Sequence, residues 1–264
     1  MKSTKTPADK ARTRVSGYSK QKRKKLSEKA RALMNKPTLV AFLLDRSGSM
    51  NDCKAETITG FNAYIATLKE RVLSEAMLDM VFTLTQFDSL GIDLIHNAVP
   101  LKSVKDLTPE TFAPRSMTPL YDAIGKTVRA TQDKAGTKYK VLFVTLTDGQ
   151  ENASHEFNLD SIRALIKEME DKHAYTFAHI GVGADGWTAT RSYTAGTRSA
   201  SNVFMADKGD EKRTYARFAG QTVAHAKSAG NVICSAQNFW KGAQDEPDPT
   251  PGKINKTGKG KFTI

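Results

Sequence analysis

The sequence predicts an α/β protein with a doubly wound, mostly parallel central sheet that is flanked by helices and has one antiparallel edge strand. Short runs at residues 37–44 and 140–147 are largely apolar, as in strands that are buried on both faces of a parallel sheet. Other segments carry apolar residues at three- and four-residue steps, which is the spacing of a helix with one buried face. A polar turn follows each of the two apolar runs, and ligands of open α/β sheets bind at this end of the strands.

In the first half of the chain, the alternation begins with a strand and continues with a helix whose apolar residues recur from Ile58 to Val72. The next strand is followed by a polar turn and a shorter β-segment, which we expect to pair with it antiparallel as an edge hairpin. A loop with three prolines comes next, and loops of this length in compact domains are often functional. These elements cover residues 37–44 (strand), 52–73 (helix), 77–87 (strand), 91–99 (edge strand) and 100–118 (loop).

In the second half, a helix begins at Pro119, because proline is favoured in the first helical turn. A buried strand, a polar loop and a helix with one apolar face follow. A further strand ends in two glycines, and a short helix, a short strand and a final helix complete the alternation. These elements cover residues 119–133 (helix), 140–147 (strand), 148–156 (loop), 158–171 (helix), 174–182 (strand), 185–195 (helix), 202–205 (strand) and 209–229 (helix).

The net charge of +12 divides the chain into three parts. Residues 1–36 hold 13 Lys and Arg against 2 acidic residues, and we expect this basic arm to be largely disordered or helical. Residues 37–230 form the α/β domain and carry a net charge of −1. Residues 231–264 form a C-terminal tail, because its prolines and glycines interrupt helices and central strands. The basic character therefore belongs to the arm and not to the folded domain.

Two interpretations of the basic arm are open. The cluster Lys22–Lys25 is of the kind that contacts nucleic-acid phosphates or an acidic surface, and it is also typical of a solvated tail. Tyr18 is the one aromatic residue of the arm, which argues against recognition of bases by stacking.

The polar turn after the first strand carries the best candidate site. Asp45, Ser47 and Ser49 present hard oxygen donors, which are the ligands that Mg²⁺, Mn²⁺ or Ca²⁺ prefers. By itself this pattern also fits a helix cap. Thr118 precedes the start of a helix, however, and Asp148 ends a second buried strand. Since both strands are predicted to end at the same edge of the sheet, these five oxygen donors can gather at one metal site.

The series Asp45-x-Ser47-x-Ser49, with a distant Thr118 and a distant Asp148, resembles the metal-ion-dependent adhesion site (MIDAS) of the von Willebrand factor A (vWA) domain family. The resemblance implies a Rossmann-like vWA fold. It further implies that the three hydroxyls bind a divalent cation directly and that the two carboxylates act directly or through water. One position on the metal would be left for an Asp or Glu of a partner protein.

The resemblance covers roughly residues 37–230. The segments 118–123 and 147–152 are similar to the versions of the motif found in intracellular bacterial and bacteriophage members of the family, more than to those of animal adhesion proteins. Some of these relatives are associated with stress responses or with chaperone-like ATPases, and the resemblance does not choose between them.

We therefore expect a divalent-metal-dependent protein-binding module and not an enzyme. One alternative is a nucleic-acid-associated protein that binds through residues 1–36, with the domain as a scaffold. Another is a hydrolase that uses the same metal, for which no general base can be identified. The sequence contains no Gly-x-x-x-x-Gly-Lys-Ser/Thr loop and no Gly-x-Ser-x-Gly elbow, and its five histidines lack metal-ligand spacing.

The cysteine content and the distribution of apolar residues also indicate the cellular compartment. Cys53 and Cys234 are the only cysteines, and they do not resemble a disulfide framework. No apolar run reaches the roughly 18–20 residues that span a bilayer, and the lysine-rich N-terminus lacks the apolar segment of a secretory signal. We expect a cytoplasmic protein of a bacterium or of a phage-infected cell, without membrane contact.

Overall fold

The computed structural model describes residue 32 and residues 36–74, 79–206 and 211–227. Most of the basic arm at 1–36 and the whole tail at 231–264 lie outside these residues, so their predicted character and the domain boundaries stay predictions.

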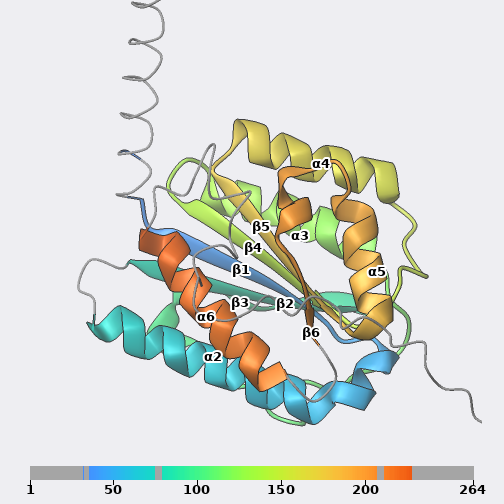
Figure 1. Ribbon diagram of the computed structural model, residues 1–264, viewed down its shortest axis with the longest axis horizontal. Helices are drawn as coiled ribbons and strands as arrows, with labels where there is room; N and C mark the ends of the chain where they lie inside the picture. Colours follow the sequence, from blue (N-terminus) through green and yellow to red (C-terminus); the bar gives the residue numbers. More distant parts are fainter. Residues whose placement is uncertain (1–31, 33–35, 75–78, 207–210, 228–264) are drawn as a thin grey trace, which may run out of the picture.

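Within the described residues, six strands form one sheet in the order β3-β2-β1-β4-β5-β6, which crosses the middle of the molecule in Figure 1. All neighbouring strands are parallel except β3, which pairs antiparallel with β2 at the edge of the sheet. The predicted mixed sheet with one antiparallel edge strand is therefore confirmed. The strands are β1 (Thr38–Asp45), β2 (Met80–Asp88), β3 (Gly91–Pro100), β4 (Lys140–Thr147), β5 (Tyr175–Val182) and β6 (Val203–Ala206).

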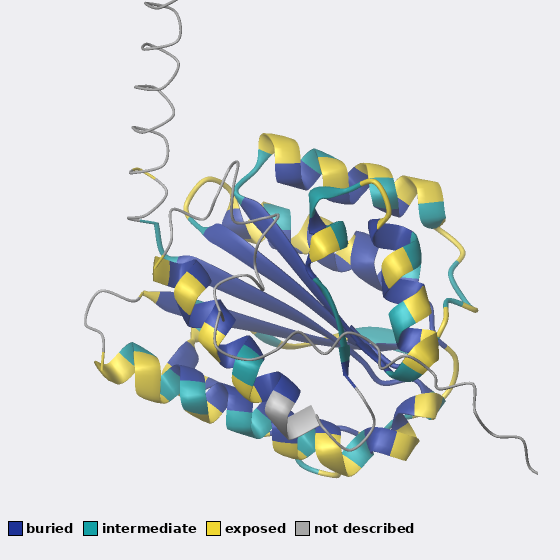
Figure 2. Cartoon of the chain, in the orientation of Figure 1, coloured by how far each residue is buried: buried dark blue, intermediate teal, exposed yellow. Residues whose placement is uncertain are grey.

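Helices cover both faces of the sheet. Helices α2 and α6 pack together on one face, and α3, α4 and α5 lie on the other (Figure 1). Their buried residues are turned toward the sheet and their exposed residues toward solvent (Figure 2). The helices are α2 (Lys54–Ser74), α3 (Leu120–Ala135), α4 (Leu159–Lys172), α5 (Gly183–Thr194) and α6 (Glu211–Lys227), with short 3₁₀ helices η1 (Gly48–Cys53), η2 (Leu101–Ser103) and η3 (Arg198–Ser201).

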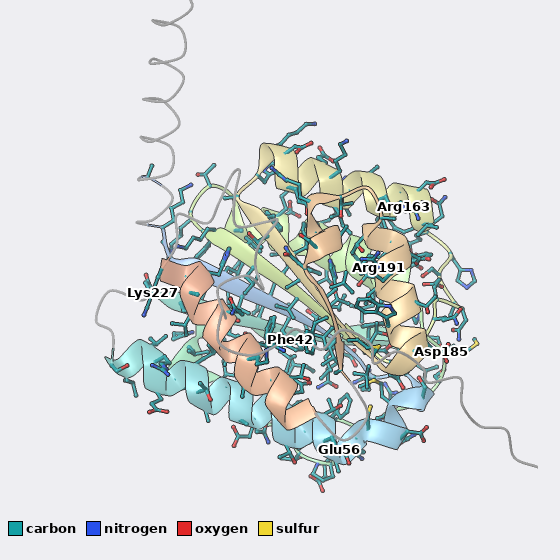
Figure 3. All side chains as sticks on the ribbon, in the orientation of Figure 1. Phe42, Glu56, Arg163, Asp185, Arg191 and Lys227 are labelled. Atoms are coloured by element: carbon teal, nitrogen blue, oxygen red, sulfur yellow. The ribbon has the colours of Figure 1, made fainter. Side chains whose placement is uncertain are left out.

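The core explains why β1 is apolar without alternation. Alternate residues of this strand pack into two separate clusters, one under α2 and α6 and the other under α3, α4 and α5. Phe42 lies at the centre of the first cluster (Figure 3), where its ring meets Phe61 edge-on at 5.5 Å between centroids. A strand that is covered on both faces needs an apolar residue at every position.

One local expectation needs correction. The first helix does not begin at residue 52, because η1 occupies residues 48–53 and the α-helix starts at Lys54. The long loop after β3 contributes to the core. Its apolar residues join the cluster under α2, and those buried at 4 % exposure or less are Leu101, Val104, Leu107 and Phe112.

Of the two cysteines, Cys234 lies outside the described residues and Cys53 is buried. The thiol of Cys53 lies 3.7 Å from the carbonyl oxygen of Met50. No helix among the described residues is both long enough and apolar enough to cross a membrane.

Two histidines are buried in the folded domain, His179 on β5 and His225 on α6. Burial lowers the pKa of His179 from 6.5 to about 3. Burial also lowers the pKa of His225 to about 3, and the nearby charge of Lys140 acts in the same direction. Nδ1 of His179 lies 2.9 Å from the hydroxyl of Tyr193. Both rings are therefore neutral at physiological pH.

We predict that these histidines make the protein less stable in acid. Between pH 6.5 and 3 the unfolded chain binds a proton at each ring that the folded chain does not, so stability falls as the pH falls. Going from pH 7 to pH 5 should lower the free energy of unfolding by about 2 kcal/mol for each histidine. Urea unfolding at both pH values tests this by comparing wild type with His179→Phe, since other titrating groups cancel in the difference. An equal loss in both proteins would contradict the prediction.

Candidate metal centre

The register of the sheet brings the first part of the motif, the turn Asp45–Ser49, together with its last part, Asp148. Strands β1 and β4 are parallel neighbours, with Leu44 opposite Leu146, so Asp45 and Asp148 follow at the same edge. The hydroxyl of Ser49 donates a hydrogen bond of 2.7 Å to Oδ1 of Asp148 and lies 3.2 Å from the hydroxyl of Ser47. The turn after β1 and the end of β4 therefore meet through their oxygen atoms.

Thr118 reaches the same place from the loop before α3. A Cβ atom on Gly149 would lie 3.3 Å from Oγ of Ser49 and 3.5 Å from Oγ1 of Thr118, so both hydroxyls border the small space beside this glycine. Asn152 holds Thr118 there, because its side-chain oxygen accepts from the Thr118 N–H at 2.8 Å and its own N–H donates to the Thr118 carbonyl at 3.1 Å. All five predicted residues are thus brought to one edge of the sheet.

At this edge of the sheet, the side chain of Asp45 has an unusual electrostatic environment. Its carboxylate is fully buried and accepts hydrogen bonds from the Ser47 N–H at 2.7 Å and from the Thr147 hydroxyl at 2.6 Å. Burial raises the pKa of Asp45 to about 7 despite these bonds, and the charge of Asp148 contributes to the rise. Among the residues that the structure describes, no lysine or arginine forms an ion pair with Asp45. A cation would stabilise its charged form.

The donor set fits a hard divalent cation. It consists of two carboxylates and three hydroxyls, which suit Mg²⁺, Mn²⁺ or Ca²⁺. No group of three or more His, Cys, Asp and Glu side chains placed to hold a metal occurs in the described part of the chain, so a site of the usual zinc type is absent there. Ser49 is exposed while Asp45, Ser47, Thr118 and Asp148 are buried, and the set is therefore open to solvent on one side.

An ion-pair cluster that we did not predict lies next to this set. Arg46 turns away from Asp45 and binds Asp88 at the end of β2 through Nε at 2.8 Å and through a terminal nitrogen at 2.7 Å. Asp93 on β3 accepts from Arg46 as well, at 2.7 Å, and Arg115 donates to Asp88 at 3.0 Å. Burial alone would raise the pKa of Asp88, but its bonds to Arg115, Leu90 and Arg46 together lower it.

This cluster supports the loop that delivers Thr118. The Arg115 N–H donates to the Arg46 carbonyl and the Gly48 N–H donates to the Ser116 carbonyl, both at 2.9 Å. The motif turn and the loop are therefore joined by main-chain bonds and by the shared carboxylate of Asp88. This pairing could not be predicted from the sequence, because Asp88 also fits the hairpin turn that follows it.

A second support ties the start of α3 to the loop after β4. Asp122 accepts from the N–H groups of residues 155, 156 and 157, and Glu151 accepts from the Tyr121 N–H at 2.9 Å. Burial alone would raise the pKa of Asp122, but the three backbone bonds outweigh it and lower the pKa. Gln150 donates to Asp185, labelled at the start of α5 in Figure 3, at 3.0 Å. The loop after β4, which borders the candidate metal centre, is therefore tied by hydrogen bonds to the start of α3 and to the start of α5.

No protein-family model matches the sequence, and no curated protein matches it. Among solved structures, the chain is similar to the von Willebrand factor domain of the type V pili tip protein Mfa5 from Porphyromonas gingivalis, with 8% identity, a TM-score of 0.52, and coverage of 73% of this chain and 97% of that one. It is also similar to the pilus adhesin SpaC from Lactobacillus rhamnosus GG, with 14% identity, a TM-score of 0.51, and coverage of 73% and 30%.

Proximal thread matrix protein 1 from the mussel byssus is a third match, with 13% identity, a TM-score of 0.50, and coverage of 74% of this chain and 47% of that one. The chain thus spans about half the length of the mussel protein. At these identities the likeness concerns the fold alone. The fold is that of von Willebrand factor A domains, as the motif predicted, and the roles of the five site residues stay predictions.

We predict that removing the charge of Asp88 loosens this edge of the sheet. The Asp88→Asn variant should lose about 2–3 kcal/mol of unfolding free energy, because it leaves the buried Arg46 with only the half-exposed Asp93 as a charged partner. Chemical denaturation measures the loss, and amide hydrogen exchange at residues 115–118 should become faster. The control is Arg115→Ala, whose half-exposed side chain should contribute less than about 1 kcal/mol. Equal losses in the two variants would contradict this role of Asp88.

Proposed function

We propose that the protein is a non-enzymatic binding module that captures an acidic side chain of a partner protein through a divalent cation. The observation that carries this proposal is the gathering of five oxygen-donor residues, one of which is a buried Asp45 that has no positively charged partner in the described residues. The preferred cation is Mg²⁺, with Mn²⁺ or Ca²⁺ as substitutes, since all three favour oxygen ligands.

Each residue has a distinct part in this proposal. The hydroxyls of Ser47, Ser49 and Thr118 would hold the cation directly, and the carboxylates of Asp45 and Asp148 would hold it directly or through water. Bound there, the cation supplies a positive centre that attracts a carboxylate from outside the protein. The exposure of Ser49 supports an approach from the solvent side.

The rim of the site supports a preference for an acidic residue with an apolar neighbour. Met117, next to Thr118, is 55% exposed, and Leu90 in the adjacent hairpin turn is 70% exposed. The two loops are joined by the Ser89 N–H, which donates to the Met117 carbonyl at 2.9 Å. Large apolar side chains held in place at the edge of a polar site are suited to contact with a partner protein.

The proposed compartment is the cytoplasm of a bacterium or of a phage-infected cell. The low cysteine content and the likeness of the motif segments to those of intracellular relatives support this placement.

We predict that the double variant Ser47→Ala, Ser49→Ala loses metal binding, because it removes two of the three hydroxyl ligands. Calorimetry should detect one Mg²⁺ per wild-type chain and at least a roughly tenfold weaker affinity in the variant. Peptide display on wild type in Mg²⁺ should enrich sequences with Asp or Glu, and EDTA should remove the enrichment. The control is Ser103→Ala in η2, an exposed serine that should behave as wild type.

Two outcomes would refute this function. The first is a full-length wild-type protein that takes up none of Mg²⁺, Mn²⁺ and Ca²⁺. The second is metal uptake with enrichment of peptides that contain no acidic residue, which would leave the site as a metal centre without the proposed ligand.

The charge of the basic arm favours a second candidate function, the binding of nucleic acid or of an acidic surface. Residues 1–36 carry a net charge of +11 out of the +12 of the whole chain, and lysine and arginine clusters bind phosphates through release of counterions. In this proposal the folded domain is a scaffold, and the metal centre is not required for binding.

We predict that deletion of residues 1–36 removes retention on duplex DNA, whereas the Ser47→Ala, Ser49→Ala variant retains it. Retention should weaken steeply as the salt concentration rises and should survive EDTA, because phosphate contacts need no metal at the protein. Filter binding at several salt concentrations makes the measurement. Retention by the deletion variant equal to that of wild type would exclude the arm as the binding element.

A further inference from the structure

Charged side chains of opposite sign stand on the two sides of the candidate metal centre. The oxygen donors lie at the ends of β1 and β4, in the middle of the sheet. On one side of them, Asp185 follows β5, where it is exposed and accepts from Gln150 (Figure 3). On the other side, Arg115 is bound to Asp88 at the end of β2. A partner that reaches the oxygen donors therefore meets a guanidinium only on the β2 side of the described residues that border them.

The guanidinium of Arg115 has hydrogen-bond donors that the protein does not use. Its Nε donates to Asp88 at 3.0 Å, and its terminal nitrogens make no hydrogen bond with the described residues. The side chain is 51% exposed. Arg46 takes the larger share of the nearby negative charge, because Asp88 and Asp93 both lie 2.7 Å from its terminal nitrogen. An arginine that is held through Nε still presents its two terminal nitrogens to a further carboxylate.

The main chain fixes Arg115 directly beside the motif turn. A Cβ atom on Gly48 would lie 3.2 Å from the carbonyl oxygen of Ser116 and 3.9 Å from the carbonyl carbon of Arg115, so the close approach needs a glycine. Ser116 has a φ of 63°, which is uncommon for residues other than glycine, and its hydroxyl is hydrogen-bonded to that of Ser89. Such a conformation persists where the surrounding structure fixes it, as it does at many binding sites.

The spacing of the strands sets the distance between Arg115 and the oxygen donors. Neighbouring strands lie about 4.8 Å apart, so the end of β2 is roughly 5–10 Å from the ends of β1 and β4. In an extended peptide, side chains two residues apart point to the same side and are separated by about 6.6 Å. Two carboxylates with one residue between them can therefore reach both places.

We infer that Arg115 forms a second subsite, which binds a second carboxylate of the same partner segment. The inference rests on the proposed function, in which the first carboxylate goes to the metal centre. The segment then carries two acidic residues that are separated by one residue of any kind. The exposed side chains of Leu90 and Met117 lie close by, since the Leu90 N–H donates to Asp88 at 2.7 Å. A partner that covers them would exclude water and strengthen the pair between Arg115 and its carboxylate.

The test is selection from a displayed library of random peptides in Mg²⁺ and in EDTA. Wild type should enrich peptides with two acidic residues one residue apart, and only in Mg²⁺. Arg115→Ala should still enrich the first acidic residue but lose the preference for the second, whereas Arg115→Lys should keep a weaker preference because it keeps the charge. The matched control is Arg71→Ala in the last turn of α2, an exposed arginine away from the site, which should select as wild type does.

Two measurements with a selected peptide separate binding from a structural effect. Arg115→Ala should bind the two-acid peptide about fivefold more weakly than wild type does, and should bind equally well the version whose second acid is replaced by its amide. The NMR resonance of the Arg115 Nε–H group should shift when the two-acid peptide is added and move less with the amide version. Calorimetry should give the same Mg²⁺ affinity for Arg115→Ala and wild type, since Arg115 is not a metal ligand.

The outcomes distinguish the subsite from the function on which it rests. Enrichment of a single acidic residue by wild type in Mg²⁺ would overturn the subsite and leave the proposed function standing, and so would an equal preference for the second acid in Arg115→Ala and wild type. Selection without any acidic residue that depends on Mg²⁺ would overturn both. Melting curves of the variants report whether each one folds.

Discussion

The buried carboxylate of Asp45 is the constraint on which the rest of the site depends. A carboxylate that is removed from water loses its hydration, and two hydrogen bonds replace that hydration only in part. The two donors come from the motif turn and from β4, in the form of the Ser47 N–H and the Thr147 hydroxyl. The parallel pairing of β1 with β4 places both beside the carboxylate, and a shift of one residue in that register would remove the second donor. The register of β1 with β4 in the fold is therefore also the register that the buried carboxylate needs.

Arg46, the residue after Asp45, shows how this protein compensates a buried charge with its own side chains. Arg46 is nearly as buried as Asp45, but Asp88 and Asp93 both lie 2.7 Å from one of its nitrogens. Asp45, one position earlier, receives only neutral donors, and Asp148 adds a second negative charge nearby. Of these two adjacent buried residues, Arg46 is therefore paired with opposite charges and Asp45 is not. In the proposed function, a divalent cation would supply the positive charge that Asp45 does not receive from the described residues.

The oxygen donors could be predicted from the sequence because each stands at the end of a recognisable segment. Asp45 and Asp148 follow apolar runs, and parallel strands bring such ends together without further information. The ion pairs and the buried loop residues around the site could not be predicted in the same way. The partner of Arg46 is 42 residues away, and a carboxylate in a hairpin turn has an adequate local explanation. Phe112 is buried in a loop that has no periodic pattern, so only the tertiary structure reveals that it belongs to the core.

Helix α3 connects the candidate metal centre with a groove of about 640 Å³ that lies between α3 and the β2–β3 hairpin. Thr118 lies just before its first turn, and Thr127 lines the groove about two turns further on. The start of the helix is fixed to the loop after β4 through Asp122 and Glu151, and that loop begins at Asp148. Because the backbone hydrogen bonds of a helix keep its residues in fixed relation, a sideways movement of α3 would change the position of Thr118 relative to Ser49. The geometry of the oxygen donors thus depends on how the outer flank of α3 is packed, and the groove is where that packing is incomplete.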